Sequence, residues 1–380
     1  MFDYQLFHVE HSPFGLYIHV PFCLKKCIYC GFCSVINTSL IDRYLDVLAK
    51  EMGRSAVAGL KPRTVYVGGG TPSCIGVRNI ERVLRIVGES FDMSEVLEYT
   101  FECNPEDVGD ELAAALAGDG VNRVSMGVQS LDDKMLKFLG RRHKAAKVGE
   151  AIGSLRKAGV GNISVDCIYG LPRIDDFDPL ADVGRFLELG VEHMSFYSLQ
   201  YEENAPITRM VERGDVDVMS DDDVCDLYDA LVEKMRGAGY VHYELSNFAK
   251  PGRESKHNLS YWDRVPYWSF GPAAASFDGK VRMTNTCDVE EYLASEGQKK
   301  SLVEKLTGEQ IFIEQVMLKM RKSDGLNLSE VDDRYMPSLR EKLGIEMKEG
   351  NVVRLANGNY AIPEGRWMVS DSIIGRLALI

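Results

Sequence analysis

Three cysteines near the start of the chain have a spacing suited to an iron–sulfur cluster. Cys23, Cys27 and Cys30 lie in CLKKCIYC, with three residues and then two between them. A loop with this spacing can turn three thiolates onto one [4Fe–4S] cubane and leave the fourth iron open. An open iron can chelate the amino and carboxylate groups of methionine, so we predict that the cluster binds S-adenosylmethionine. On one-electron reduction, such a cluster can cleave the sulfonium and release a 5′-deoxyadenosyl radical.

A structural zinc site is the alternative interpretation of the same loop. Zinc prefers four ligands, and Cys33 could complete the set. A zinc site leaves a nearby glycine triplet and the strand–helix pattern described below unexplained, so we favour the cluster. The role of Cys33 stays open. The other five of the nine cysteines are scattered singly, and we expect them to be small buried apolar residues.

The elements that must position these residues alternate regularly up to about residue 200. Each β-rich run is followed by an amphipathic stretch, which predicts a parallel sheet with right-handed crossovers. The expected strands are 15–20, 63–67, 97–102, 122–127, 162–168 and 193–199. The expected helices between them are 39–57, 76–89, 109–118, 144–158 and 178–189.

Polar residues and glycines follow the expected strands. The cysteines follow the first strand, and GGGTP (68–72) follows the second. A doubly wound sheet also satisfies the alternation, but polar groups gathered on one rim are how a βα-barrel builds its site. Six units rather than eight predict an open (β/α) partial barrel with a lateral gap for a bulky ligand.

The glycine triplet has a chemical rationale of its own. Gly69, Gly70 and Thr71 would give the backbone room and free N–H groups beside a small zwitterion. A tight turn is the alternative explanation, but a turn needs only one glycine. Three in succession at a strand end therefore favour a binding role.

The cysteine motif after a first strand resembles that of the radical-SAM superfamily. The resemblance implies that Tyr29 packs near the adenine and that the glycine triplet meets the methionine amino group. It further implies that Glu102, in FECNPE, takes the ribose hydroxyls. The other cofactor-pocket positions that it implies are Tyr17, Gln129, Arg141 and Asp166. Taken singly, each of these residues could equally have a structural role, such as a salt-bridged strand end.

A longer series of motifs narrows the resemblance to one branch of the superfamily. The motifs are YIHVPFC, GGGTPS, NPE, RVSMGVQS, LGRRH, DCIYGLP and YELSNFAKPG. They resemble the branch that contains oxygen-independent coproporphyrinogen III oxidase (HemN) and its relative HemW, from about residue 14 to at least 280. HemN removes two propionate carboxylates oxidatively from a porphyrinogen. HemW is described as a chaperone that binds heme and passes it to acceptor proteins.

Three features favour the HemW side of that branch. Only 22 residues precede Cys23, whereas the oxidase has a longer N-terminal arm. Gly31 and Phe32 follow the third cysteine, where the oxidase typically has C-x-C and HemW sequences usually have an aromatic at the place of Phe32. Finally, HNLSYW (257–262) matches the H-N-x-x-Y-W signature of HemW.

The HNLSYW motif also has a chemistry that suits heme. The neutral imidazole of His257 is a good axial ligand for heme iron, and the aromatic residues that follow offer flat apolar faces. The alternative is that His257 only hydrogen-bonds a nearby loop while the aromatics form core. With the resemblance, we favour contact between His257 and heme and leave direct ligation open.

The rest of the chain predicts a connector and a small appendage. A helix is expected at 221–238, a short strand at 240–244 and a polar connector at 247–256. Two helices (308–322 and 328–343) and a hairpin at Asn357-Gly358 then resemble a winged-helix-like domain. We therefore expect a radical-SAM partial barrel over 1–245, a HemW-type connector and heme-contact segment over 246–300, and the appendage over 301–380.

Composition limits the classes of partner. The net charge of −13 makes nucleic acid a poor default partner. Residues 1–13 lack the basic start and apolar core of a signal peptide, and no run approaches the length of a membrane-spanning helix. We expect a cytoplasmic protein with no membrane anchor. The sequence does not fix the oligomeric state, and a homodimer is one option.

The sequence thus predicts a heme chaperone that carries a [4Fe–4S] cluster and S-adenosylmethionine and has heme and heme-acceptor proteins as partners. A coproporphyrinogen III oxidase, or another radical enzyme acting on a tetrapyrrole, is the main alternative. A zinc-stabilised interaction module is a third.

Overall fold

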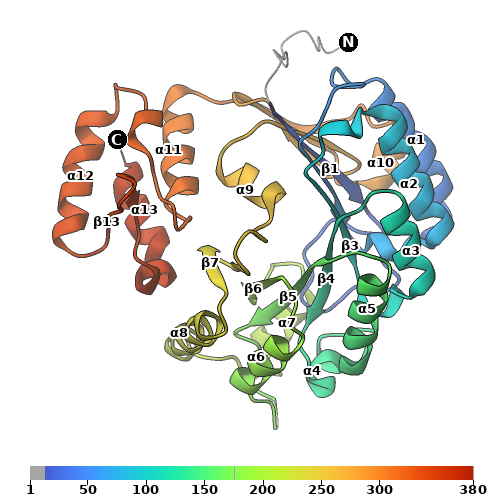
Figure 1. Cartoon of the computed structure of the whole chain (residues 1–380), viewed down its shortest axis with the longest axis horizontal. Helices are drawn as coiled ribbons and strands as arrows, with labels where there is room; N and C mark the ends of the chain where they lie inside the picture. Colours follow the sequence, from blue (N-terminus) through green and yellow to red (C-terminus); the bar gives the residue numbers. More distant parts are fainter. Residues whose placement is uncertain (1–12, 175, 380) are drawn as a thin grey trace.

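The first half of the chain alternates strands and helices as expected (Figure 1). The structure, a computed structural model, describes residues 13–174 and 176–379. The first six strands are β1 (Gly15–Val20), β2 (Thr64–Gly69), β3 (Glu98–Cys103), β4 (Arg123–Gln129), β5 (Asn162–Tyr169) and β6 (His193–Ser198). The helices between them are α1 (Ile41–Gly53), α2 (Val77–Ser90), α3 (Asp110–Gly118), α4 (Asp133–Phe138), α5 (Ala145–Lys157) and α6 (Pro179–Glu188). All six expected strands and five expected helices are confirmed, and α4 was not expected.

These six strands are parallel neighbours in one sheet. The sheet has the order β12-β11-β10-β9-β1-β2-β3-β4-β5-β6-β8-β7, and β12 and β7 are its two ends. The barrel is therefore open, as expected. Helices α1, α2, α3 and α5 cover the outer side of the sheet (Figure 1). The outward-facing residues of the strands are apolar and pack in the core, whereas inward-facing residues such as Glu102 and Asp166 line a cavity.

Local sequence explains where several of these helices begin. Asp178 accepts hydrogen bonds from the backbone N–H groups of Leu180 and Ala181, and Pro179 occupies the first position of α6. In α1 and α2 the apolar residues fall on one face, which packs on the sheet.

The segment expected to be a connector contributes to the same sheet instead. Asn247–Ala249 forms β8, which pairs antiparallel with β6, so the expectation of a polar connector from 247 is wrong at its start. All three residues of β8 are buried, and Asn247 hydrogen-bonds Glu244. The remaining elements up to residue 305 are α7 (Pro206–Glu212), α8 (Asp221–Gly237), β7 (Val241–Glu244), α9 (Lys256–Trp262), β9 (Tyr267–Phe270), β10 (Ala275–Phe277), β11 (Val281–Asn285), α10 (Val289–Ala294) and β12 (Lys300–Lys305).

Strands β9 to β12 extend the sheet beyond β1. Strand β9 pairs in parallel with β1, and β10, β11 and β12 continue antiparallel. Trp268, Phe270, Val289 and Tyr292 belong to the same hydrophobic core as β1 to β6. The division at residue 245 stays a prediction, but the sheet and its core continue across it.

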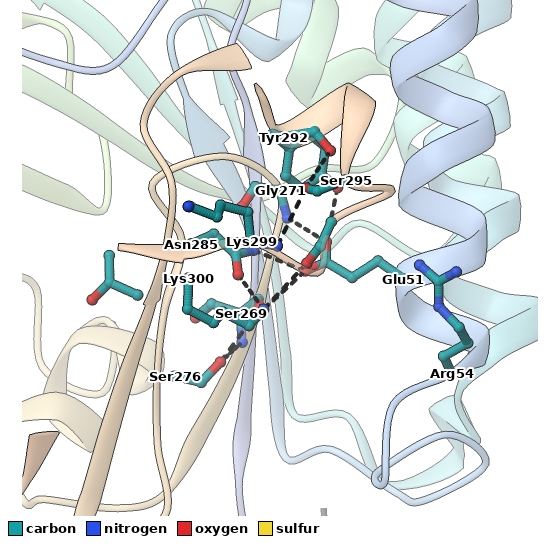
Figure 2. Close-up of polar contacts among 12 residues, drawn as sticks. Glu51, Arg54, Ser269, Gly271, Ser276, Asn285, Tyr292, Ser295, Lys299 and Lys300 are labelled. Atoms are coloured by element: carbon teal, nitrogen blue, oxygen red, sulfur yellow. Dashed lines mark hydrogen bonds and ion pairs between the residues drawn. The ribbon is translucent and has the colours of Figure 1, made fainter. Parts of the chain in front are cut away.

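A largely buried carboxylate joins α1 to these added strands (Figure 2). Glu51 accepts hydrogen bonds from Gly271 N at 2.9 Å, Asn285 Nδ2 at 2.8 Å and the Tyr292 hydroxyl at 2.8 Å. Lys300 Nζ lies 3.7 Å from the same carboxylate and also contacts Asn285. A buried charge is tolerable only when it is paired and hydrogen-bonded in this way.

The C-terminal part of the chain forms its own hydrophobic cluster. It contains α11 (Gly308–Lys319), α12 (Met336–Lys348), β13 (Val353–Arg354), β14 (Tyr360–Ala361) and α13 (Ser370–Ala378). The hairpin at Asn357-Gly358 is confirmed. The helix expected over 328–343 begins later, at Met336, because a helix through that whole range would hold Pro337 in its interior. A 3-10 helix (Glu364–Val369) and α13 were not expected.

Figure 1 shows these helices beside the barrel, with α9 between them and the sheet. Within the described residues, no helix is long and apolar enough to cross a membrane. Residues 1–12, which carry most of the expectation about a signal peptide, lie outside the described part of the chain.

Candidate functional site

A cavity of about 720 Å³ opens at the carboxyl ends of the barrel strands. Its wall contains residues that follow β1 to β6 and residues from the C-terminal part of the chain. Eleven of the thirteen predicted site residues line it. They are Cys23, Cys27, Tyr29, Cys30, Gly69, Gly70, Thr71, Glu102, Gln129, Arg141 and Asp166.

The three predicted cluster cysteines face this cavity from one loop. Cys23 Sγ lies 3.5 Å from Thr71 Oγ1, and Arg141 Nη1 lies 3.6 Å from Cys27 Sγ. Among the described residues, no three Cys, His, Asp or Glu side chains converge as ligands of a single metal ion. A cubane needs no such convergence, because each thiolate ligates a different iron. Three thiolates on one loop at a cavity wall are therefore compatible with such a cluster.

Cys33 is turned away from the cavity. Its thiol donates to the backbone carbonyl of Cys287 at 2.9 Å, and it is not among the cavity-lining residues. Its own carbonyl accepts a hydrogen bond from His19 Nε2 at 2.8 Å, which fixes the end of the cysteine loop. In this conformation Cys33 is a bystander rather than a fourth ligand.

The glycine triplet is required by close backbone contacts. A Cβ on Gly70 would lie 2.6 Å from the carbonyl oxygen of Phe22 and 3.1 Å from Cys23 Sγ. Gly69 has φ of +119°, a conformation that other residues rarely adopt. Gly70 N and Thr71 N donate to Val20 O and Phe22 O, and Gly69 N donates to Glu102, so the expectation of free N–H groups here is wrong. These backbone groups tie the triplet to the cysteine loop instead.

Glu102 lies beneath the triplet at the end of β3. Its carboxylate accepts hydrogen bonds from the Tyr66 hydroxyl at 2.7 Å and from Gly69 N at 3.1 Å. Burial raises the pKa of Glu102 to about 7, and the nearby Asp166 adds to the rise. A carboxylate placed at the cavity wall can accept hydrogen bonds from a diol when it is ionised.

Gln129 and Asp166 complete the rim on β4 and β5. Gln129 has φ of +75° and lies at an irregularity in the pairing of β4 with β5, which marks a strained backbone at the site. Asp166 accepts hydrogen bonds from the Ser125 hydroxyl at 3.2 and 3.3 Å. Burial raises the pKa of Asp166.

Arg141 connects the cysteine loop to the strand ends. Beyond Cys27, it donates to Asn104 Oδ1 at 2.7 Å and to the carbonyl of Gly127. Its Nε is buried without a hydrogen-bond partner. A buried donor without a partner at a cavity wall is the kind of group that a bound polar ligand satisfies.

Tyr17 and His257 are the two predicted site residues that do not line the cavity. The Tyr17 hydroxyl donates to His19 Nδ1 at 3.1 Å, so it acts on the cysteine loop through His19. His257 is 1% exposed, and its Nδ1 and Nε2 lie 2.8 Å from Thr64 Oγ1 and 2.8 Å from the Tyr261 hydroxyl. Burial lowers the pKa of His257 to about 3, which keeps the ring neutral.

The structure therefore places His257 behind the site. Its ring lies 5.1 Å from that of Tyr66, whose hydroxyl donates to Glu102. Both ring nitrogens already have partners, so His257 is not free to ligate iron in this conformation. Heme contact by His257 stays a prediction, and direct ligation requires both hydrogen bonds to break.

Sequence reasoning missed several cavity residues. Tyr66, Asn104 and Arg123 come from strand or strand-end positions that look structural in the sequence. Tyr66 and Arg123 could have been found from the strand alternation, which puts them on the same face as other polar residues. Trp367, Met368, Ser370 and Asp371 had no such indication, because only the three-dimensional fold brings the C-terminal segment to the cavity.

The residues present fit both groups that the cysteine motif implies. Cys23, Cys27 and Cys30 can hold a [4Fe–4S] cluster. The glycine triplet, Glu102 and the partly unpartnered Arg141 can hold a zwitterionic nucleoside beside it.

Comparison with known proteins gives consistent results. The model of the radical SAM superfamily matches residues 17–187. The heme chaperone HemW of Lactococcus lactis is 36% identical over 340 residues, which cover 89% of this chain and 89% of that protein. HemW of Bacillus subtilis is 33% identical over 333 residues, 85% of this chain and 87% of that protein. The structure of Escherichia coli coproporphyrinogen III oxidase (HemN), a radical SAM enzyme, has a TM-score of 0.82 at 20% identity and covers 97% of this chain and 90% of that one.

Proposed function

The chain belongs to the HemW family and carries a radical SAM domain, and from this premise we propose that it is a cytoplasmic heme chaperone that binds heme and passes it to acceptor proteins. Family membership supports the proposal through relatives that are named heme chaperones. The expected absence of nucleic acid from its partners stays a prediction that rests on charge.

The cluster and S-adenosylmethionine would occupy the part of the cavity nearest β1 to β5. Cys23, Cys27 and Cys30 would hold the cluster, and the glycine triplet and Glu102 would hold S-adenosylmethionine. When bound and reduced, this pair can supply a 5′-deoxyadenosyl radical. The chain's own residues orient the cofactor: Tyr66 holds the Glu102 carboxylate, and Arg141 links the cysteine loop to the ends of β3 and β4.

The observation that carries the proposal is the remaining part of the cavity. Several large apolar or aromatic side chains line it at positions that the resemblance does not assign to the cluster or to S-adenosylmethionine. They are Ile168, Tyr169, Tyr197, Leu199, Leu245, Trp367 and Met368. Pockets for flat apolar ligands are lined in this way, with a few polar groups to set orientation. A macrocycle such as heme suits this wall.

Oxidation of coproporphyrinogen III is the alternative function. The likeness to HemN supports the fold alone at 20% identity. No contact of the described residues favours the oxidase over the chaperone, so we keep the chaperone as the conclusion.

An anaerobic heme titration tests the proposal. The cluster-reconstituted protein should bind heme saturably, followed by Soret absorbance, and the same sample should not convert coproporphyrinogen III. Conversion, or an absence of saturable heme binding, would refute the chaperone function.

A matched pair of tyrosines tests the location of heme. Tyr197 lines the cavity and is partly exposed, whereas Tyr201 is similarly exposed and does not line it. Tyr197→Ala should weaken heme binding and Tyr201→Ala should leave it unchanged. Equal affinities for the two variants would place heme elsewhere.

A further inference from the structure

Met368 puts a thioether into the wall of the cavity, in the part that the cluster and S-adenosylmethionine do not need. It lies in the 3-10 helix Glu364–Val369, which leads into α13. A thioether is one of the side-chain groups that ligate heme iron in proteins. To ligate iron, this sulfur must be held in a defined place by the fold.

Two contacts fix the position of Met368. The Tyr169 hydroxyl, at the end of β5, donates a hydrogen bond to Met368 Sδ at 3.9 Å, which uses one of the two lone pairs on sulfur and leaves the other for iron. The Met368 side chain also packs against the hydrophobic core of the barrel. The adjacent Trp367 belongs instead to the C-terminal hydrophobic cluster, where its Nε1 donates to Ile362 O at 2.8 Å. Two neighbouring side chains are thus anchored in different cores, which holds the thioether at the boundary between them.

The other side chains that ligate heme iron are disfavoured at the cavity. Its lining tyrosines would ligate iron as phenolates, but burial raises the pKa of each of their hydroxyls; they are Tyr29, Tyr66, Tyr169 and Tyr197. No histidine is among the residues that line the cavity within the described chain. His242 and His257 lie behind the wall, each with both ring nitrogens in hydrogen bonds. Cys23, Cys27 and Cys30 belong to the cluster loop. Cys103 is buried in β3, and burial raises the pKa of its thiol, whereas the thiolate is the form that binds metal.

We propose that Met368 is an axial ligand of heme iron when heme occupies the apolar part of the cavity, so that the C-terminal segment carries the iron-binding group. This inference rests on the proposed function, since it names the ligand within that same site. A neutral thioether forms a weaker bond to iron than an imidazole or a thiolate does. A weak, exchangeable ligand suits a protein that must release heme to an acceptor.

Spectroscopy of the wild-type protein is the first test. The probe is ferric heme added anaerobically to the cluster-reconstituted full chain. Near-infrared magnetic circular dichroism should show the far-red charge-transfer band typical of a thioether on ferric iron. Saturable heme binding without this band would overturn the inference and leave the proposed function standing.

Variants of equal bulk provide the second test. Met368→Leu should abolish the band and lower heme affinity about tenfold. Met368→His should replace the band by the spectrum of an imidazole-ligated heme. Met347→Leu is the matched control, because Met347 is exposed on α12 and away from the cavity.

The possible outcomes distinguish the inference about Met368 from the proposed function on which it rests. A Met368→Leu protein with the wild-type spectrum and affinity would overturn the inference alone. Failure of the wild type to bind heme at all would overturn the proposed function, and the inference with it. Iron and sulfide content of each variant shows that the cluster, and hence the fold around it, is intact.

Discussion

His257 Nδ1 lies 2.8 Å from Thr64 Oγ1, so a residue of α9 is joined to the first residue of β2 across 193 positions of sequence. The contact is buried, and Tyr261 occupies the other ring nitrogen. The backbone N–H of His257 also donates to Glu98 of β3 at 2.9 Å. The HNLSYW motif therefore fastens α9 to the sheet directly behind the cavity.

Replacing His257 by Ala should destabilise the protein by about 2 to 4 kcal/mol, because it leaves a void and removes a partner from two buried hydroxyls. Urea unfolding measures this loss. Tyr261→Phe, which removes only one hydrogen bond, should cost about 1 kcal/mol. The far-red band of bound heme should persist in the His257→Ala protein. Loss of the band in a His257→Ala protein whose stability is unchanged would show that His257 itself ligates iron.

Replacing Cys27 by Ala should abolish the cluster, since two thiolates cannot hold it. Cys33→Ala should retain the full iron content, because the Cys33 thiol is directed at Cys287 O and away from the cavity. Iron and sulfide analysis after anaerobic reconstitution checks both. A Cys27→Ala protein with full iron would identify Cys33 as a substitute ligand.

The binding of S-adenosylmethionine should strengthen as pH rises through about 7. Burial raises the pKa of Glu102 to about 7, and only the ionised carboxylate accepts hydrogen bonds from both ribose hydroxyls. Titrations of the cluster-loaded protein at about pH 6 and about pH 8.5 measure the change. The Glu102→Gln protein should show no such pH dependence, whereas Glu89→Gln, a change at an exposed carboxylate on α2, should behave as wild type.

The raised pKa of Glu102 also predicts an effect on the stability of the folded protein. A carboxyl group whose pKa is raised by folding destabilises the folded state as pH rises from the unfolded pKa, near 4.5, towards 7, and the full loss remains at higher pH. Glu102→Gln should therefore stabilise the protein without S-adenosylmethionine at about pH 8, by an amount on the order of 2 to 3 kcal/mol. The gain should disappear below about pH 4.5. Equal stabilities of the wild-type and Glu102→Gln proteins at about pH 8 would contradict the burial that raises the pKa of this carboxylate.

The carboxylates of Glu51 and Glu296 should differ sharply in their contribution to stability. Glu51 is largely buried among four partners, and Glu51→Ala should cost about 3 to 5 kcal/mol because Lys300 is left without its counter-charge. Glu296 pairs with Lys50 and Arg54 at the surface, and Glu296→Ala should cost under about 1 kcal/mol. Denaturant unfolding of the two variants gives the comparison. Similar losses of stability in the two variants would mean that the contacts of Glu51 are not what joins α1 to β9–β12.

Local patterns in the sequence were sufficient for the barrel and for the cavity rim. The β-rich runs predicted β1 to β6 and put the cysteine loop and the glycine triplet on one rim, because strand ends on one edge of a parallel sheet must converge. The other cavity residues that were predicted came from the resemblance to the radical-SAM superfamily; they are Tyr29, Glu102, Gln129, Arg141 and Asp166. The position of His257 could not be predicted in that way. A histidine with aromatic neighbours suits both a heme site and a core, and only its long-range contacts with Thr64 and Glu98 decide where it lies.

The part of the cavity wall that comes from the C-terminal segment could not be predicted from the sequence, for a similar reason. Residues 364–378 carry no motif, and no local pattern distinguishes a side chain that packs in one core from its neighbour that packs in another. Trp367 packs in the C-terminal cluster and Met368 packs against the core of the barrel because the two folded units meet at this point. That meeting depends on contacts between residues far apart in the sequence.

The position of β1 between β2 and β9 has a consequence for biosynthesis. A ribosome releases residues 267–270 only after all six strand–helix units have emerged, so the strand that leads into the cysteine loop lacks one of its two neighbours for most of translation. Its backbone groups on that side meanwhile face water. Iron–sulfur assembly on the loop is therefore expected to follow the emergence of residue 270, and nascent chains stalled before residue 267 should fail to retain a cluster.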